Sequence, residues 1–133
     1  MSAEAEILRK YRTIAVVGLS RDETRDSHSV ATYMQDAGYR IVPVNPSETE
    51  VLGEKAHPTV ASAPPPVEIV NVFRRPRAVP SVVDDAIAAG AKVIWMQPGI
   101  VNEEAAAKAR EAGLEVVMDR CIRSEHRRLV ASA

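Results

Sequence analysis

The chain has 133 residues, of which 46% are hydrophobic and 26% charged, and it contains one cysteine, Cys121. This length predicts a single domain over residues 1–133, with a core of about 13–129. Seventeen basic and eighteen acidic side chains give a formal net charge of −1, which argues against a nucleic-acid-binding field over the whole domain. A lone cysteine excludes an internal disulfide framework and a cysteine-based zinc cluster.

The apolar runs of the chain are far shorter than the roughly 20 residues that cross a bilayer. Residues 1–12 include acidic side chains and lack the apolar stretch of a secretory signal. We therefore expect a cytoplasmic protein with neither a membrane nor a nucleic acid as its partner.

The first half of the chain predicts a short helix, two strands with a helix between them, and a long connection. Residues 3–10 suit a helix, and the β-branched run 13–17 suits a strand buried on both faces. Apolar residues at helical spacing follow up to Gly38. Residues 39–44 form the next strand, in which Pro43 is expected near the strand end because it lacks an N–H. The proline-rich residues 45–66 predict a mostly irregular connection.

The second half continues the alternation of strands and helices. The expected elements in chain order are a strand over 67–73, a helix over 79–87, a strand over 92–96, a helix over 102–112, a strand over 114–118 and a short helix over 123–131. Strands that alternate with helices imply right-handed crossovers and a parallel sheet. The prediction is a single α/β domain with a doubly wound parallel sheet of about five strands, in three α/β/α layers.

Polar or glycine-containing segments follow four of the predicted strands. In open parallel sheets, ligands bind outside the carboxyl ends of the strands, where the strand order reverses. Arginine is far more frequent than lysine in this chain, and its guanidinium suits phosphate oxygens. We expect a phosphorylated ligand, held by backbone N–H groups after Gly18, by the start of the next helix and by four arginines, although a solvated basic face is the alternative. The arginines are Arg21, Arg25, Arg74 and Arg75.

A dinucleotide-binding fingerprint is incomplete here. It requires Gly-x-Gly-x-x-Gly after the first strand, but no glycine occurs between Gly18 and Gly38. It also places an acidic residue at the end of the second strand, where this chain has Asn45 and Pro46. Both departures weaken the prediction of a nicotinamide or flavin dinucleotide.

Six segments occur in an order and spacing that identify a family: Val16–Ser20, Val42–Pro46, Leu52–Lys55, Val72–Arg74, Trp95–Ile100 and Met118–Ile122. From about residue 14 to 129 the chain resembles the stand-alone CoA-binding-domain proteins of bacteria and archaea. That family is similar to the N-terminal domain of the succinyl-CoA synthetase α subunit. The resemblance implies a Rossmann-like fold that binds coenzyme A (CoA) or an acyl-CoA, without the domains that the ligase reaction needs.

The resemblance also implies roles for individual residues. The loop after the first strand would face the CoA phosphates, the end of the second strand would lie by the adenosine, the end of the third would line the site, and the end of the fourth would approach the pantetheine arm. In this order the residues are Gly18, Leu19 and Ser20; Asn45 and Pro46; Phe73 and Arg74; and Gln97, Pro98 and Gly99.

The remaining reactive side chains form no convincing catalytic set. Cys121 is expected to be a small buried residue, or alternatively a thiolate that an adjacent Arg120 favours and that could form a mixed disulfide with CoA. The histidines at 28, 57 and 126 lack metal-ligand spacing, so no metal site is predicted, although His28 could contact a phosphate. Residues 125–128 predict a charged helix face or a subunit contact.

Two functions of different classes remain. The first is non-catalytic binding of CoA or an acyl-CoA by a carrier, sensor or regulatory module. The second is an enzyme, either a small NAD(P)-dependent oxidoreductase or an acyl-CoA-handling catalyst, which would act as an oligomer. The absence of a catalytic set favours the first. A homo-oligomer or a protein partner remains open.

Overall fold

Five parallel strands form the central sheet of the protein, for which a computed structural model describes residues 2–131. In sheet order they are β2 (Arg40–Val44), β1 (Thr13–Val17), β5 (Ile69–Val72), β6 (Val93–Met96) and β7 (Glu115–Val117). The strand order reverses between β1 and β5, because the chain first moves to β2 and then returns to the other side of β1. The predicted strand number, parallel pairing and reversal are confirmed.

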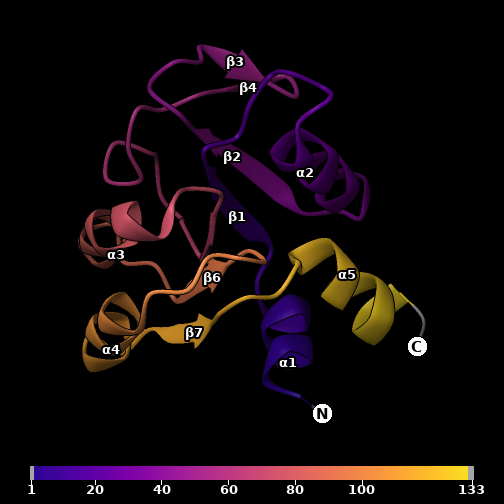
Figure 1. Cartoon of the computed structure of the whole chain (residues 1–133). Helices are drawn as coiled ribbons and strands as arrows, with labels where there is room; N and C mark the ends of the chain where they lie inside the picture. The colour runs from indigo at the N-terminus through magenta and orange to yellow at the C-terminus, as the bar shows by residue number, and fades with distance from the viewer. Residues whose placement is uncertain (1, 132–133) are drawn as a thin grey trace.

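Helices cover both faces of this sheet, as Figure 1 shows. On one face α3 (Val79–Ala88) and α4 (Glu103–Glu111) pack against a core that includes Val17, Val72 and Met96. On the other face α1 (Ala3–Lys10), α2 (Asp26–Asp36) and α5 (Ile122–His126) enclose a second core around Trp95. Alternate residues of each strand point to opposite faces, so central strands such as β1 and β6 are buried along their whole length. The fold is a Rossmann-like α/β fold in three layers, as predicted.

The connection after β2, predicted to be mostly irregular, contains a short hairpin. Strands β3 (Glu50–Val51) and β4 (Glu54–Lys55) pair antiparallel. Their two turn residues, Leu52 and Gly53, have φ of +55° and +76°. A two-residue hairpin turn with positive φ at both positions matches the twist of its strands. Strands of two residues are too short to show the alternation of apolar and polar residues on which strand prediction depends.

Pro43 is tolerated because β2 lies at the edge of the sheet. It is the penultimate residue of the strand, near the strand end as expected. Its carbonyl accepts a hydrogen bond from the His57 N–H at 3.0 Å, and the His57 carbonyl accepts one from the Asn45 N–H at 2.9 Å. The connection after β2 therefore returns to cover the last part of this sheet edge. On the rest of the edge, Pro43 leaves one N–H donor fewer unpaired, because proline has none.

Part of the C-terminal segment packs inward. Glu125 and His126 at the end of α5 are 8% and 7% exposed, so the charged face predicted for residues 125–128 is wrong for these two residues. Arg127 and Arg128 are exposed, and the alternative of a subunit contact stays a prediction. The His126 ring meets the rings of Tyr33 and Tyr39 edge to face, with centroids 5.5 and 5.6 Å away. Its Nδ1 lies 2.9 Å from the Tyr33 hydroxyl. A π-helical turn over Arg127–Ala131 follows.

Acid should loosen this C-terminal packing through His126. Burial, aided by the nearby Arg12 charge, lowers the pKa of His126 from its ordinary value of 6.5. Below about pH 6.5 the unfolded chain therefore binds more protons than the folded one, and stability falls until the pH passes the lower folded pKa. The measurement is the free energy of urea unfolding between pH 7.5 and 5.

His126→Gln is expected to reduce this fall in stability, since the amide does not titrate. His57→Gln, which changes a histidine outside the aromatic cluster, should leave the fall in place. An equal pH dependence in wild type and His126→Gln would contradict the assignment.

Candidate ligand-binding site

The site begins where β1 ends, at Gly18. Its N–H donates to the Val44 carbonyl of β2 at 2.8 Å, while on the other side the Phe73 N–H donates to the Val17 carbonyl at 2.9 Å. Gly18 has φ of +90°, and a Cβ there would collide with the Phe73 carbonyl oxygen. Only glycine combines this conformation with such a close backbone approach. The chain can therefore turn out of the sheet at the point where the strand order reverses.

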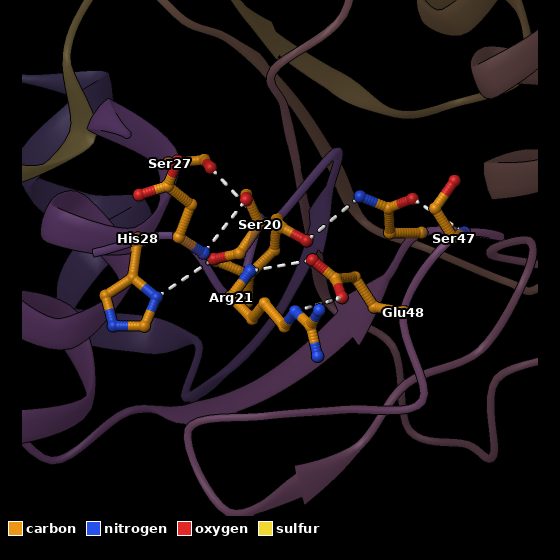
Figure 2. Close-up of polar contacts among 9 residues, drawn as sticks. Ser20, Arg21, Ser27, His28, Ser47 and Glu48 are labelled. Carbon is orange, nitrogen blue, oxygen red and sulfur yellow. Dashed lines mark hydrogen bonds and ion pairs between the residues drawn. The ribbon is translucent and has the colours of Figure 1, made fainter. Parts of the chain in front are cut away.

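The loop after Gly18 is anchored to helix α2. The Ser20 N–H donates to Ser27 Oγ at 3.1 Å, and the Ser20 carbonyl lies 2.9 Å from His28 Nδ1 (Figure 2). The carbonyl can only accept, so Nδ1 carries the proton in this contact. His28 therefore positions the loop through the Ser20 backbone. A contact between His28 and a phosphate stays a prediction.

The other side of the loop is anchored to the segment after β2. Asn45 Nδ2 donates to the Leu19 carbonyl at 3.1 Å, and its Oδ1 accepts from the Ser47 N–H at 3.0 Å. The Arg21 N–H donates to Glu48 Oε2 at 2.8 Å (Figure 2). Several loop N–H groups that the sequence analysis assigned to phosphate thus have partners within the protein.

A cavity of about 680 Å³ opens beside this loop at the carboxyl edge of the sheet. Its walls come from the loop, the start of α2 and the ends of β2 and β5. The N-cap residue of α2, Arg25, makes no side-chain capping hydrogen bond. Since the His28 and Ser29 N–H groups donate to the Arg25 carbonyl, the helix start offers an anion its positive end and the N–H groups of Asp26 and Ser27. The lining residues are Gly18, Ser20, Thr24, Arg25, Asp26, Ser27, Asn45, Phe73, Arg74, Arg75 and Ile100.

The cavity brings together half of the twelve residues proposed from the sequence. Gly18, Ser20, Arg25, Asn45, Phe73 and Arg74 line it, together with Arg75. The Leu19 side chain is fully buried in the core, and Pro46 is exposed outside the lining. The Arg21 side chain is 82% exposed and contacts Glu48, with Nε 3.8 Å from Oε1.

A second cavity of about 210 Å³ adjoins the first, with Asp26, Phe73 and Ile100 in both linings. Gln97 and Pro98 lie here, together with Val30, Cys121 and Arg123. Gln97 is 3% exposed, and its Oε1 accepts from the Ile122 N–H at 3.1 Å. It therefore fixes the start of α5 at this cavity.

Two further contacts hold the segments after β6 and β7 together. Asp119, with φ of +60°, accepts the Gly99 N–H on Oδ1 at 2.7 Å. Trp95 Nε1 donates to the Arg120 carbonyl at 2.8 Å. Gly99 lines neither cavity but turns the chain beside them. The sequence showed Asp119 only as part of a family motif, and the contact itself has no sequence signal.

Cys121 is partly exposed and lines the second cavity, so it differs from the small buried residue expected. Burial raises the pKa of its thiol, but hydrogen bonds from the Ser124 backbone and hydroxyl, from the Gln97 side chain and from the Arg123 backbone outweigh this and lower the pKa below its ordinary value. Arg120, which the sequence suggested as the cause, instead lies 3.9 Å from a Glu125 oxygen.

Sequence reasoning missed Thr24, Asp26, Ser27 and Ile100 in the larger cavity, and Val30 and Arg123 in the smaller one. The hydroxyl and carboxyl residues before the predicted helix were a usable signal for a helix start facing the edge. Val30 belongs to the apolar residues at helical spacing before Gly38, which predicts a core position, and it is 2% exposed. Arg123 depends on how α5 docks, which local sequence does not specify.

The sheet reversal, the glycine turn and an uncapped helix beside a basic cavity are features of a Rossmann-like domain. The chain belongs to the CoA-binding domain family, whose model matches residues 12–127. The family predicted from the six segments is therefore confirmed.

Relatives and solved structures agree with this assignment. The chain is 48% identical over 121 residues to the uncharacterized protein YneT of Bacillus subtilis, covering 91% of this chain and 90% of YneT. It superposes on a hypothetical protein from Pyrococcus horikoshii with a TM-score of 0.93 and 44% identity, covering 96% and 89% of the two chains. An acetyl-coenzyme A synthetase from Candidatus Korarchaeum cryptofilum superposes with a TM-score of 0.72 and 26% sequence identity. That match covers 84% of this chain but only 26% of the synthetase chain.

Residues 2–131 contain no group of three His, Cys, Asp or Glu side chains arranged to hold a metal ion. Within the same residues, no helix has the length and apolar character needed to cross a membrane.

The lowered pKa predicts that Cys121 reacts with iodoacetamide at a lower pH than an ordinary thiol does, because the thiolate is the nucleophile. The measurement is the rate of alkylation against pH, followed by intact mass. Since the chain has one cysteine, the label reports Cys121 alone.

Ser124→Ala removes one of the hydrogen bonds to sulfur and is expected to shift the alkylation midpoint to higher pH. A wild-type midpoint at or above that of a free cysteine peptide would contradict the expected reactivity.

Proposed function

We propose that the protein binds coenzyme A, free or acylated, in the cavity of about 680 Å³ and its smaller neighbour. The observation that carries this proposal is the set of three guanidinium groups beside the uncapped start of α2, in a chain of the CoA-binding domain family. Arg25 lies at the start of the helix, and Arg74 and Arg75 follow β5. A diphosphate placed there would meet both the helix dipole and the arginines.

We place the remaining length of CoA, its pantetheine arm, in the second cavity. Phe73 and Ile100 line both cavities and offer apolar surface to a pantetheine arm that passes between them. The arm would then end near Gln97 and Cys121. This arrangement supports the roles that the family resemblance implied for Asn45 on the nucleotide side and for Gln97 and Pro98 on the pantetheine side.

We further propose that binding is not followed by a reaction, so that the protein serves as a carrier, sensor or regulatory module. The polar residues that line the larger cavity suit recognition of an anion. The alternatives are an acyl-CoA-handling enzyme and an oxidoreductase that uses NAD(P). The oxidoreductase would require the domain to bind a nicotinamide dinucleotide, which the departures from the dinucleotide fingerprint disfavour.

The expected result of calorimetric titration is saturable binding of CoA and no binding of NADH. NADH fluorescence should be unchanged by the protein, whereas CoA should raise the melting temperature, since a ligand that binds only the folded state stabilises it. Binding of NADH in preference to CoA would favour the oxidoreductase, and absence of CoA binding at millimolar concentration would refute the proposal.

Arg74→Ala is expected to weaken CoA binding by about 1–3 kcal/mol, the range for a charge-assisted hydrogen bond to phosphate. The matched control is Arg77→Ala, which removes an exposed arginine of the same segment that lies outside both cavity linings. Calorimetry measures both affinities. Equal affinities in wild type and Arg74→Ala would remove Arg74 from the site.

A further inference from the structure

Arg21 and Glu48 form a charged pair at the nucleotide end of the site, outside the linings of both cavities. Figure 2 shows the two residues facing each other from the loop after β1 and the segment after β2. The Glu48 side chain is 12% exposed, and one of its oxygens accepts the Arg21 backbone N–H at 2.8 Å. The carboxylate is thus fixed, while the guanidinium reaches into solvent.

The contact between the two charged groups leaves most of the guanidinium unused. Its Nε lies 3.8 Å from Glu48 Oε1, and the Arg21 side chain is 82% exposed. The two terminal nitrogens of an arginine form the fork that binds a phosphate in a bidentate way. Arg21 therefore has the geometry to bind an anionic group above the end of β2 while its Nε stays near Glu48.

The position of the pair determines which part of a nucleotide it would meet. In Rossmann-like folds the ribose lies above the end of the second strand, where an acidic side chain binds unmodified ribose hydroxyls and an arginine accommodates a ribose phosphate. Here an acidic residue, Glu48, and an arginine, Arg21, are both present. Asn45 connects the segment after β2 to the loop after β1. Arg25, Arg74 and Arg75, by contrast, line the larger cavity beside α2 and β5.

We propose that Arg21 determines the specificity of the site for a ribose phosphate, and that it recognises the 3′-phosphate of CoA and discriminates against 3′-dephospho-CoA. This inference rests on the proposed function and adds a second phosphate subsite to it. Glu48 makes the discrimination depend on Arg21, because without the guanidinium a fixed carboxylate would face the incoming phosphate and repel it.

Calorimetry with CoA and with 3′-dephospho-CoA tests the inference. Wild type is expected to bind CoA about tenfold more tightly than 3′-dephospho-CoA. Arg21→Ala should weaken CoA binding by about tenfold and leave the affinity for 3′-dephospho-CoA unchanged. Adding Glu48→Gln to Arg21→Ala should restore part of the CoA affinity, since the amide can still accept the backbone N–H but carries no charge.

Lys108→Ala is the matched control, because it removes a cation from the Lys108–Asp84 ion pair between α3 and α4, away from the cavities. It should change neither affinity. Far-UV circular dichroism and melting temperature show whether each variant is folded. If Arg21→Ala weakens both ligands equally or weakens neither, the inference is wrong. Equal binding of the two ligands by wild type overturns it as well but leaves the proposed function intact, whereas binding of neither ligand overturns both.

Discussion

The close approach of Gly18 to Phe73 is the constraint on which the ligand-binding edge depends. Strands β1 and β5 are neighbours in the sheet, yet their chains must leave it in different directions. The Phe73 N–H continues the ladder to Val17, and one residue later Gly18 turns with φ of +90° against the Phe73 carbonyl. A side chain at Gly18 would force the two chain ends apart and move the loop, the start of α2 and the arginines after β5 relative to one another.

The positive charge of this protein is concentrated at particular places, although the net charge is close to zero. The net charge of −1 conceals a basic lining on one edge, where Arg25, Arg74 and Arg75 meet the start of α2. Other arginines hold the C-terminal segment in place. The Arg128 guanidinium lies 2.6 Å from an oxygen of the buried Glu125, and the Arg123 guanidinium donates to the Ser29 hydroxyl at 2.7 Å. A composition-level argument cannot separate these two groups, because both have the same formal charge.

The sequence predicted the architecture well because its signals are local and repeated. Apolar runs such as 13–17 and the helix-ending Gly38 each specify their own element, and the alternation of strands and helices specifies the parallel sheet. The β3–β4 hairpin was missed because two-residue strands carry no periodicity.

The site was harder to predict because its contacts join distant segments. Loop N–H groups were assigned to phosphate, but the N–H of Arg21 binds Glu48, 27 positions away. Likewise His126 was placed on a charged face by its neighbours, although it packs against Tyr33, 93 positions away. Such pairings follow from how helices dock on the sheet, which no local pattern encodes.

The anchored loop has a consequence for the entropy of ligand binding. Ser27, His28 and Asn45 hold the backbone of Leu19 and Ser20 through hydrogen bonds within the protein. The backbone freedom of these residues, worth about 1–2 kcal/mol for each residue, is therefore lost during folding and not when a ligand arrives. A ligand at this edge would therefore meet a loop whose backbone at Leu19 and Ser20 is already ordered, and its binding would not have to offset that cost.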